Sequence, residues 1–365
     1  MKFGERISWF FLISNSGKPK QLWGVFMVNL RQYIKELPKA ELHLHIEGTF
    51  EPELLFKIAE RNGIKLRYPT VGALRAAYQF TQLQDFLDLY YAGTHVLIHE
   101  QDFYELTWNY LLKAHEDHII HTEVMFDPQA HTSRGVLFGT IISGINRALI
   151  EGREKLGMSS GLIMSFLRHL SEVEAFKTLE ESLPYRKLIT AVGLDSSEKG
   201  NPPGKFERVF AKAKEYGFLT VAHAGEEGPP ENIRGALDLL NVSRIDHGNS
   251  CMLDPQLIER LATERIPLTI CPLSNLRLKV VDDLSLHPLK AMLNAGLRVT
   301  INSDDPAYFG GYLNDNFIAI TESLSLTKQE ILQLVHNSFE ASFLPQNTRQ
   351  RYIRLVNNHV NGVIE

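Results

Sequence analysis

Short apolar runs that alternate with longer helical stretches are the feature of this sequence that most constrains its fold. Beyond residue 36 there are eight such runs, rich in β-branched residues, and most of them end in polar residues. The runs are Glu41–Ile46, His121–Asp127, Gly161–His169, Leu188–Asp195, Phe218–His223, Arg244–His247, Pro267–Cys271 and Leu297–Asn302. Helical stretches such as Lys205–Gly217 and Pro255–Arg265 separate them. Strands that alternate with helices form right-handed parallel βαβ units, so eight of them predict an α/β protein with a closed (β/α)8 TIM barrel.

One connection of the predicted barrel is much longer than the others. Between the first and second strands lie roughly seventy residues of helical pattern, including Glu53–Arg61 and Leu83–Thr94. Connections that follow a barrel strand lie on the C-terminal face, where active sites are built. We therefore expect a helical lid over about residues 48–118, with an outer packing elaboration of the barrel as an equal alternative.

The N-terminal segment is expected to lie outside the fold. A basic start at Lys2 and Arg6 precedes the apolar run Ile7–Ile13, as in a weak signal peptide, but no small-residue cleavage site follows. We interpret residues 1–27 as an N-terminal extension and residues 28–365 as a single metallohydrolase domain. N-terminal sequencing of the native protein is expected to begin near Met27.

Composition excludes several classes of protein. The 365 residues carry a net charge of −5, so the chain lacks the basic excess of a general nucleic-acid or anionic-membrane surface. Two cysteines are too few for a disulfide framework or a four-cysteine metal site, and a reducing, cytoplasmic location is the default. No apolar run approaches the eighteen or so residues that span a bilayer. The sequence leaves the oligomeric state open, a homo-oligomer included.

Histidine and carboxylate side chains recur at the ends of the predicted strands. His43 and His45 flank Leu44, and side chains alternate faces along a strand, so both imidazoles point into the barrel. Such a pair on its own more often packs or forms hydrogen bonds than binds metal. Three further strand ends carry the same residue types: His223-Ala224-Gly225-Glu226, Asp246-His247-Gly248 and Asn302-Ser303-Asp304-Asp305-Pro306. Together these residues predict one site at the C-terminal mouth of the barrel.

Imidazoles with one carboxylate form a site that suits zinc. The residues that can supply it are His43, His45, His223 and Asp304. A water molecule at the remaining position would be activated, because zinc lowers its pKa towards 7. Glu226 is placed to act as proton shuttle and general acid, and His247 to orient the activated water. Asp305 must diverge from its neighbour Asp304, which leaves its carboxylate free for the substrate.

These motifs resemble, in order and spacing, those of the adenosine and adenine deaminase family. The resemblance covers roughly residues 36 to 340, and five stretches carry it: Pro38–Gly48, His223–Glu226, Asp246–Gly248, Cys271–Asn275 and Ser303–Pro306. It implies an amidohydrolase-type barrel with one Zn²⁺ per chain that hydrolyses the 6-amino group of a purine. By position, the implied zinc ligands are His43, His45, His223 and Asp304. Glu226 is then the donor to purine N1, His247 the hydroxide-orienting residue and Asp305 the partner of N7.

Two departures from the nucleoside-deaminating members favour the adenine deaminase branch. The nucleoside-deaminating members have the pattern His-x-His-x-Asp-Gly at the first strand. This chain has Glu47 at the position of the aspartate, and a glutamate is one methylene longer, so it would intrude on the space for a sugar. At the fourth strand, Gly193–Glu198 replaces an Ala-Gly-Asp-Glu turn. Glu47 and Gly193 are accordingly predicted to bind substrate.

The predicted function is zinc-dependent hydrolytic deamination of adenine to hypoxanthine and ammonia, a purine-salvage reaction in which metal-activated water attacks C6. The alternatives are adenosine or N6-substituted adenine as substrate, another metallohydrolase, or a catalytically silent relative. Many barrel metallohydrolases hold two metals with a bridging lysine carbamate, but no lysine occurs between Lys187 and Lys199, around the fourth strand. We expect a small purine base as the ligand, and neither nucleic acid nor a membrane as a partner.

Overall fold

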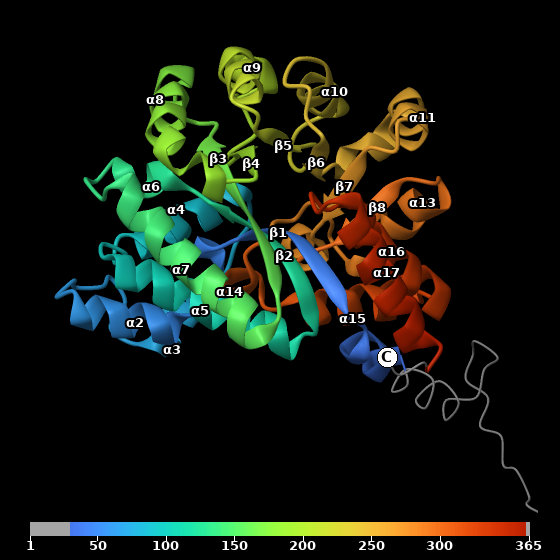
Figure 1. The fold of residues 1–365 in the computed structure, drawn as a ribbon, viewed down its shortest axis with the longest axis horizontal. Helices are drawn as coiled ribbons and strands as arrows, with labels where there is room; N and C mark the ends of the chain where they lie inside the picture. Colours follow the sequence, from blue (N-terminus) through green and yellow to red (C-terminus); the bar gives the residue numbers. More distant parts are fainter. Residues whose placement is uncertain (1–29, 363–365) are drawn as a thin grey trace, which may run out of the picture.

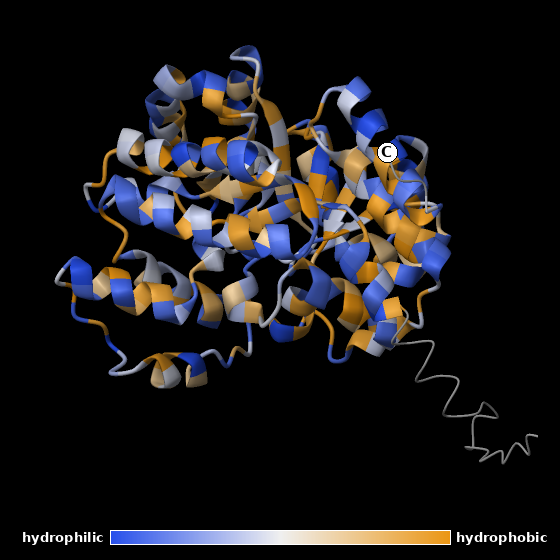
Figure 2. Ribbon diagram, turned by 60° about the horizontal axis from the view of Figure 1, so that its bottom comes forward, coloured by the Kyte–Doolittle hydropathy of each residue, from blue (hydrophilic) through white to orange (hydrophobic). Residues whose placement is uncertain are grey.

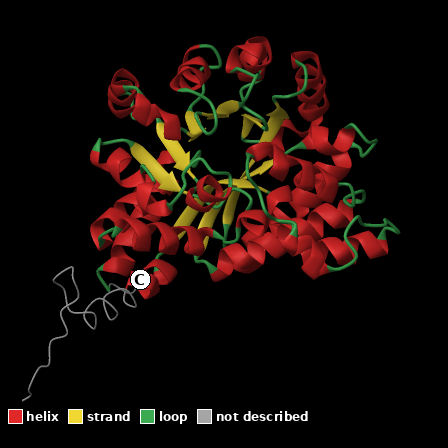
Figure 3. Cartoon of the chain, turned by 180° about the vertical axis from the view of Figure 1, so that it is seen from behind, coloured by secondary structure: helices red, strands yellow, loops and turns green. Residues whose placement is uncertain are grey.

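Eight parallel strands in sequence order form the sheet at the centre of the molecule (Figure 1). The computed structural model describes residues 30–362. The strands are β1 (Lys39–His45), β2 (Ile119–Phe126), β3 (Ser159–Leu167), β4 (Ala191–Asp195), β5 (Leu219–Ala224), β6 (Arg244–His247), β7 (Pro267–Ile270) and β8 (Arg298–Ile301). Seen from behind, they surround a central axis and the helices lie outside them (Figure 3). The predicted (β/α)8 fold class is confirmed.

The ends of the sheet meet between β8 and β1, at the position of the histidine motif. Leu44 and Asp304 form a parallel bridge. The amide of His45 donates to the carbonyl of Asp304 over 3.0 Å, and the amide of Asp304 donates to the carbonyl of His43 over 3.2 Å. The backbone contact that joins the two sheet ends therefore also brings three predicted site residues together.

Most helices alternate with the strands, as the sequence predicts. The helices between β2 and β8 are α6 (Pro128–Thr132), α7 (Phe138–Leu156), α8 (Glu172–Ser182), α9 (Glu207–Glu215), α10 (Pro230–Asp238), α11 (Pro255–Thr263), α12 (Pro272–Arg277) and α13 (Leu289–Asn294). Single 3₁₀ turns are η2 (Leu183–Leu188), η3 (Pro203–Phe206), η4 (Asn249–Leu253) and η5 (Leu284–Leu286). After β8 follow α14 (Pro306–Phe309), α15 (Leu313–Leu324), α16 (Lys328–Ala341) and α17 (Gln346–Val360). Hydrophobic and hydrophilic residues alternate along the outer helices (Figure 2), as expected when one face packs on the barrel and the other meets water.

Local sequence sets several of these boundaries. Ser171 begins α8 with a capping box, because its hydroxyl accepts from the amide of Glu174 while the Glu174 carboxylate accepts from the amide of Ser171. Most predicted boundaries differ from the observed ones by one or two residues, and three of them illustrate the causes. Leu188 belongs to η2 rather than to β4, β3 ends at Leu167 before its two polar residues, and α9 begins only at Glu207, after a 3₁₀ turn that starts at a proline.

The long connection between β1 and β2 is helical, as predicted. It contains η1 (Glu47–Thr49), α2 (Pro52–Arg61), α3 (Val71–Ala76), α4 (Leu83–Thr94) and α5 (Glu100–Glu116). The two ends of this connection lie in different parts of the structure. α5 packs on α7 in the outer ring, where a Cβ on Gly144 would lie 2.8 Å from the Cβ of Phe103. α4 instead borders the cavity described below, so the connection combines outer packing with a cover over the barrel mouth.

The predicted extension, residues 1–27, lies outside the described residues. Among residues 30–362, none of the helices combines the length and the apolar character that crossing a bilayer requires.

Candidate functional site

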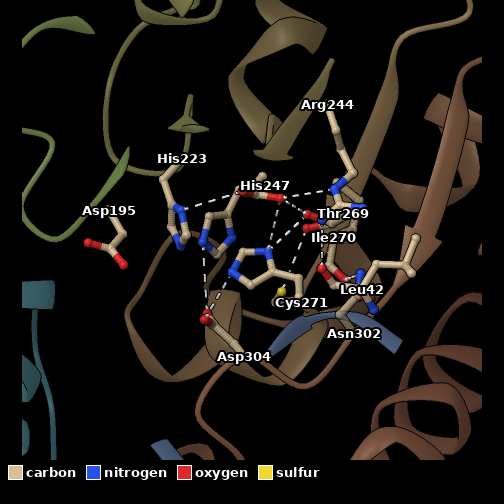
Figure 4. Close-up of polar contacts among 12 residues, drawn as sticks. Leu42, Asp195, His223, Arg244, His247, Thr269, Ile270, Cys271, Asn302 and Asp304 are labelled. Atoms are coloured by element: carbon tan, nitrogen blue, oxygen red, sulfur yellow. Dashed lines mark hydrogen bonds and ion pairs between the residues drawn. The ribbon is translucent and has the colours of Figure 1, made fainter. Parts of the chain in front are cut away.

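The predicted metal ligands converge at the C-terminal mouth of the barrel (Figure 4). Asp304 Oδ1 lies 3.2 Å from Nε2 of His43 and 3.5 Å from Nε2 of His45. Nε2 of His45 lies 3.1 Å from Nε2 of His223. All four side chains are buried. Three strand ends that are far apart in the sequence thus supply one compact cluster of imidazole and carboxylate groups.

The geometry of this cluster fits a divalent metal. Ligands about 2.0–2.1 Å from a tetrahedral zinc ion lie roughly 3.3–3.4 Å from one another, close to the three distances above. Nε2 of His43 has no hydrogen-bond partner among residues 30–362. Ligand atoms of His43, His223, His247 and Asp304 also lie within 4.8 Å of one another, and His45 forms a second such group with Asp304 and Asp305. Convergent lone pairs of this kind are the donor set expected of a metal site.

The charge states of these groups suit the same role. Burial and the neighbouring imidazoles lower the pKa of His223 well below its usual value, and burial lowers that of His247 to about 3. Both rings are therefore neutral at pH 7. Burial alone would raise the pKa of Asp304, but the nearby imidazoles of His43, His247 and His45 hold it well below the usual range. His223 and His247 therefore offer neutral nitrogens, and Asp304 an ionised carboxylate, whereas burial alone would lower the pKa of His43 but the charge of Asp304 raises it.

A second row of buried groups orients the imidazoles. Thr269 Oγ1 donates to Asp246 Oδ1 over 2.8 Å, so it must accept from Nδ1–H of His43, 2.9 Å away. This fixes the tautomer of His43 with its Nε2 lone pair towards the cluster. Asp246 Oδ2 lies 3.8 Å from Nδ1 of His223, and Nε of Arg244 lies 3.6 Å from Asp246 Oδ1. Figure 4 draws these contacts on the side of the histidines away from Asp304.

Glu226 and His247 lie beside the cluster. Nε2 of His247 is 3.5 Å from the Glu226 carboxylate. Burial and the charge of Asp304 raise the pKa of Glu226 well above its usual value, which favours the protonated form of the carboxyl. His247 and Asp304 have φ angles of 64° and 62°, a left-handed backbone that non-glycine residues seldom adopt and that is concentrated at functional sites.

The turn that carries Glu226 is held by Glu198, a residue that the sequence motifs did not identify. The carboxylate of Glu198 accepts the amides of residues 225, 226, 227 and 228, at 2.8 to 3.1 Å. Four donors on one buried carboxylate fix the backbone of this turn. Glu198 is thus a positioning residue for the Glu226 side chain.

The Asp305 carboxyl stays near that of Asp304, with an oxygen of each within 4.8 Å of the other, so the predicted divergence of the two side chains is not seen. Asp305 Oδ1 has no hydrogen-bond partner within the described chain. A Cβ on Gly48 would lie only 2.0 Å from this oxygen, so a glycine at 48 makes room for the carboxyl. Burial and the adjacent Asp304 raise the pKa of Asp305 well above its usual value.

A small cavity opens onto this cluster. Its apolar wall comes mainly from α4, through residues that include Leu83, Phe86 and Tyr90. Its polar wall comes from the strand ends.

Glu47 and Gly193, predicted to bind substrate, are not among the residues that line this cavity. His131 accepts from Arg134 at Nδ1, so its Nε2–H donates to the Glu47 carboxylate over 2.9 Å. Gly193 lies inside β4, where a Cβ would approach Ser165 Oγ to 2.7 Å. Both residues are part of the wall behind the site, and their contact with substrate stays a prediction.

The cavity is lined instead by Asp127, Asp195 and Ser196, to which the sequence analysis assigned no role in the site. Asp127 directly follows β2 and Asp195 ends β4. An acidic residue at the end of an apolar run was the available signal, the same signal that identified Asp304. Nδ1 of His45 lies 3.6 Å from Asp195 Oδ2, so Asp195 also orients that imidazole.

Comparison with known proteins places this arrangement in a family. The adenosine deaminase family model matches residues 38–359. The chain belongs to the adenosine deaminase family. It is 58% identical to an adenine deaminase of Acinetobacter baylyi over 90% of this chain and 99% of the relative, and 61% identical to one of Stutzerimonas stutzeri over 86% and 99%. The crystal structure of an adenine deaminase from Arthrobacter aurescens superposes with a TM-score of 0.88 at 50% identity, covering 89% of this chain and 99% of that one. The resemblance predicted from the motifs is confirmed, and the match extends beyond residue 340.

Proposed function

We propose that this protein hydrolyses adenine to hypoxanthine and ammonia. The observation that carries the proposal is that six of the seven motif residues line one cavity and the seventh, His43, clusters with His223, His247 and Asp304, in a chain 55–61% identical to proteins named adenine deaminase. The reaction balances with one water molecule, because the C6–NH₂ bond is replaced by C6=O and the amine leaves as ammonia.

His43, His45, His223 and Asp304 are the residues that would hold a single zinc ion. Bound there, zinc would lower the pKa of a water molecule towards 7 and so make hydroxide available at neutral pH. Asp246, Thr269 and Asp195 contribute by orienting the imidazoles, through the contacts described above.

The remaining site residues act on the purine. Attack at C6 places electrons on N1, and Glu226, protonated because its pKa is raised, is positioned to donate there. N7 of adenine is an acceptor, so its partner must donate; the raised pKa of Asp305 supplies a carboxyl that keeps its proton. His247, neutral and beside Glu226, can accept a hydrogen bond from the attacking water and hold it towards C6.

The direct test is a comparison of adenine, adenosine and N6-methyladenine at equal enzyme concentration by absorbance. We expect adenine to have the highest kcat/KM of the three. A preference for adenosine or for the N6-methylated base would replace adenine as the proposed substrate, and turnover of none would favour a silent relative.

Metal content provides a second prediction. The enzyme as purified is expected to hold one zinc per chain by elemental analysis, because the four ligands form one cluster. Removal of the metal with a chelator should abolish turnover, and one equivalent of zinc should restore it. Two metals per chain would favour a binuclear hydrolase instead.

Asp305→Ala is expected to lower kcat/KM for adenine by about 10²- to 10³-fold without changing metal content, because it removes a buried donor to the substrate. Asp305→Asn, which keeps a donor of the same size, should lose less. Steady-state kinetics with elemental analysis checks both variants. Loss of zinc from the Asp305→Ala enzyme would show that Asp305 supports the metal rather than the base.

A further inference from the structure

Asp127 presents an unused acceptor to the cavity. It directly follows β2, lines the cavity, and its side chain is buried, with 3% of the residue exposed. Its Oδ2 accepts from the hydroxyl of Tyr90 over 3.2 Å. Its Oδ1 has no hydrogen-bond partner among residues 30–362, although an oxygen of Asp127 and one of Asp195 lie within 4.8 Å of each other. A buried polar atom is normally paired, so this oxygen is the kind of group that a ligand N–H would satisfy.

The order of strands around the barrel shows which part of a ligand Asp127 faces. Glu226 follows β5 and Asp305 follows β8. One arc of the rim between them runs through β6 and β7 and carries His247. The other arc runs through β4, β3, β2 and β1, and carries Asp195 and then Asp127. Asp127 therefore lies on the arc away from the reacting side, nearer to Asp305 than Asp195 is along the rim.

The perimeter of adenine has the same order. With N1 at Glu226 and N7 at Asp305, C6 and its amine face the His247 arc. Along the opposite edge, starting from the Glu226 end, N3 comes first and N9 second. N3 then faces the β4 end and N9 the β2 end, where Asp127 lies. In the free base N9 carries a proton, whereas in a nucleoside or nucleotide N9 carries the sugar.

We propose that Asp127 accepts the N9–H of adenine through its free oxygen and so selects the free base over 9-substituted purines. The inference rests on the proposed function, which fixes the orientation of the base. It needs only an acceptor oxygen, and a carboxyl group offers one in either charge state. Asp127 is thus a specificity-determining residue of the site.

Tyr90 strengthens this selection. Its ring is buried on α4, 5.3 Å from the Phe86 ring and 6.0 Å from the Tyr308 ring, which limits its movement. Its hydroxyl occupies one Asp127 oxygen and leaves the other for the ligand. A substituent on N9 would both remove the N–H donor and meet Asp127 beneath this aromatic cluster.

The test compares adenine with 9-methyladenine, which differs at N9 alone. In the wild type we expect kcat/KM for adenine to exceed that for 9-methyladenine by at least about 10³-fold, because a site built to bond an N–H rejects analogues that lack it. Asp127→Ser should lower kcat/KM for adenine by about 10²-fold and leave 9-methyladenine unchanged or improved. The ratio of kcat/KM for adenine to kcat/KM for 9-methyladenine should therefore fall about 100-fold or more.

Two further variants separate hydrogen bonding from space and from folding. Asp127→Leu keeps the branched shape in a larger side chain without an acceptor, so the ratio of kcat/KM for adenine to that for 9-methyladenine should fall there as well. Either variant that folds and retains zinc decides the question. Asp127→Asn keeps a carbonyl acceptor and should retain the ratio within about tenfold. Tyr91→Phe is the matched control, since Tyr91 lines the same cavity from the same helix but donates to Ser196 over 3.1 Å, and its ratio should equal that of the wild type.

The outcomes for this inference and for the proposed function are distinct. A wild-type enzyme that does not deaminate adenine contradicts the proposed function. If the wild-type enzyme deaminates adenine and 9-methyladenine equally well, only the role of Asp127 is contradicted. This outcome can be recognised from the wild type alone, without any variant. An unchanged ratio in folded, zinc-loaded Asp127→Ser or Asp127→Leu enzyme contradicts it as well.

Discussion

Glu226→Gln is expected to bind adenine and a full equivalent of zinc but to turn over adenine at least 10²- to 10⁴-fold more slowly, the usual contribution of a positioned general acid. The amide has nearly the same shape, so binding and folding should be retained. It can still donate a hydrogen bond to N1, but it cannot transfer a proton there. The loss should therefore appear in kcat, with little change in KM. Steady-state kinetics, elemental analysis and adenine binding by calorimetry measure the three quantities.

The neighbouring residue offers a matched control for this prediction. Glu227 carries the same side chain, lies on the same turn held by Glu198, and pairs with Lys199 at 3.2 Å instead of facing the cavity. Glu227→Gln should keep kcat within a few-fold of the wild type. If Glu226→Gln turned over adenine at a near wild-type rate, another group would have to protonate N1 and the assignment would be wrong.

The strand ends made the fold and most of the site predictable from sequence. Alternation along a strand places His43 and His45 on one face, and parallel strands in a barrel bring their carboxyl ends to one rim. The sequence of β6, Arg244–His247, was predicted with its observed bounds. Local periodicity and topology were therefore sufficient to bring His43, His45, His223, His247 and Asp304 together.

The residues that sequence reasoning missed act over long separations. Glu198 binds amides at 225–228, and Arg244 pairs with Glu123, 121 residues away in sequence. Neither local pattern nor spacing connects such partners, because the contact exists only once the barrel has formed. Glu47 illustrates the same limit, since its side chain turns to His131 and not into the cavity.

Arg244 is expected to be among the residues most important for stability. Its side chain is fully buried inside the barrel, where one guanidinium nitrogen donates to Glu123 over 2.6 Å and another to the carbonyl of Leu42 over 3.0 Å. Its Nε also faces Asp246. Replacement by methionine keeps most of the volume but leaves two buried carboxylates without their cation. Arg244→Met should therefore lower the free energy of unfolding by about 3–5 kcal/mol.

This loss should depend on pH in a defined direction. Burial alone would raise the pKa of Glu123, but Arg244 and His121 hold it below its usual value in the folded protein. A carboxyl with a lowered folded-state pKa adds stability that is fully present above its unfolded pKa, near 4.3, and is lost as the pH falls through the folded one. The difference between wild type and Arg244→Met should accordingly be largest near neutral pH and shrink in acid.

Denaturant unfolding of the zinc-loaded proteins measures this difference, with Arg208→Met as the control. Arg208 pairs with Glu172 at the surface, with most of its side chain exposed, so its replacement should cost only a small part of the loss at Arg244. Because Arg244 also faces Asp246, which contacts His223, the Arg244→Met protein should bind zinc about 10- to 100-fold more weakly. Equal stability losses in the two variants would mean that the buried carboxylates are accommodated without Arg244, and unchanged zinc affinity would show that Asp246 orients the histidine independently of it.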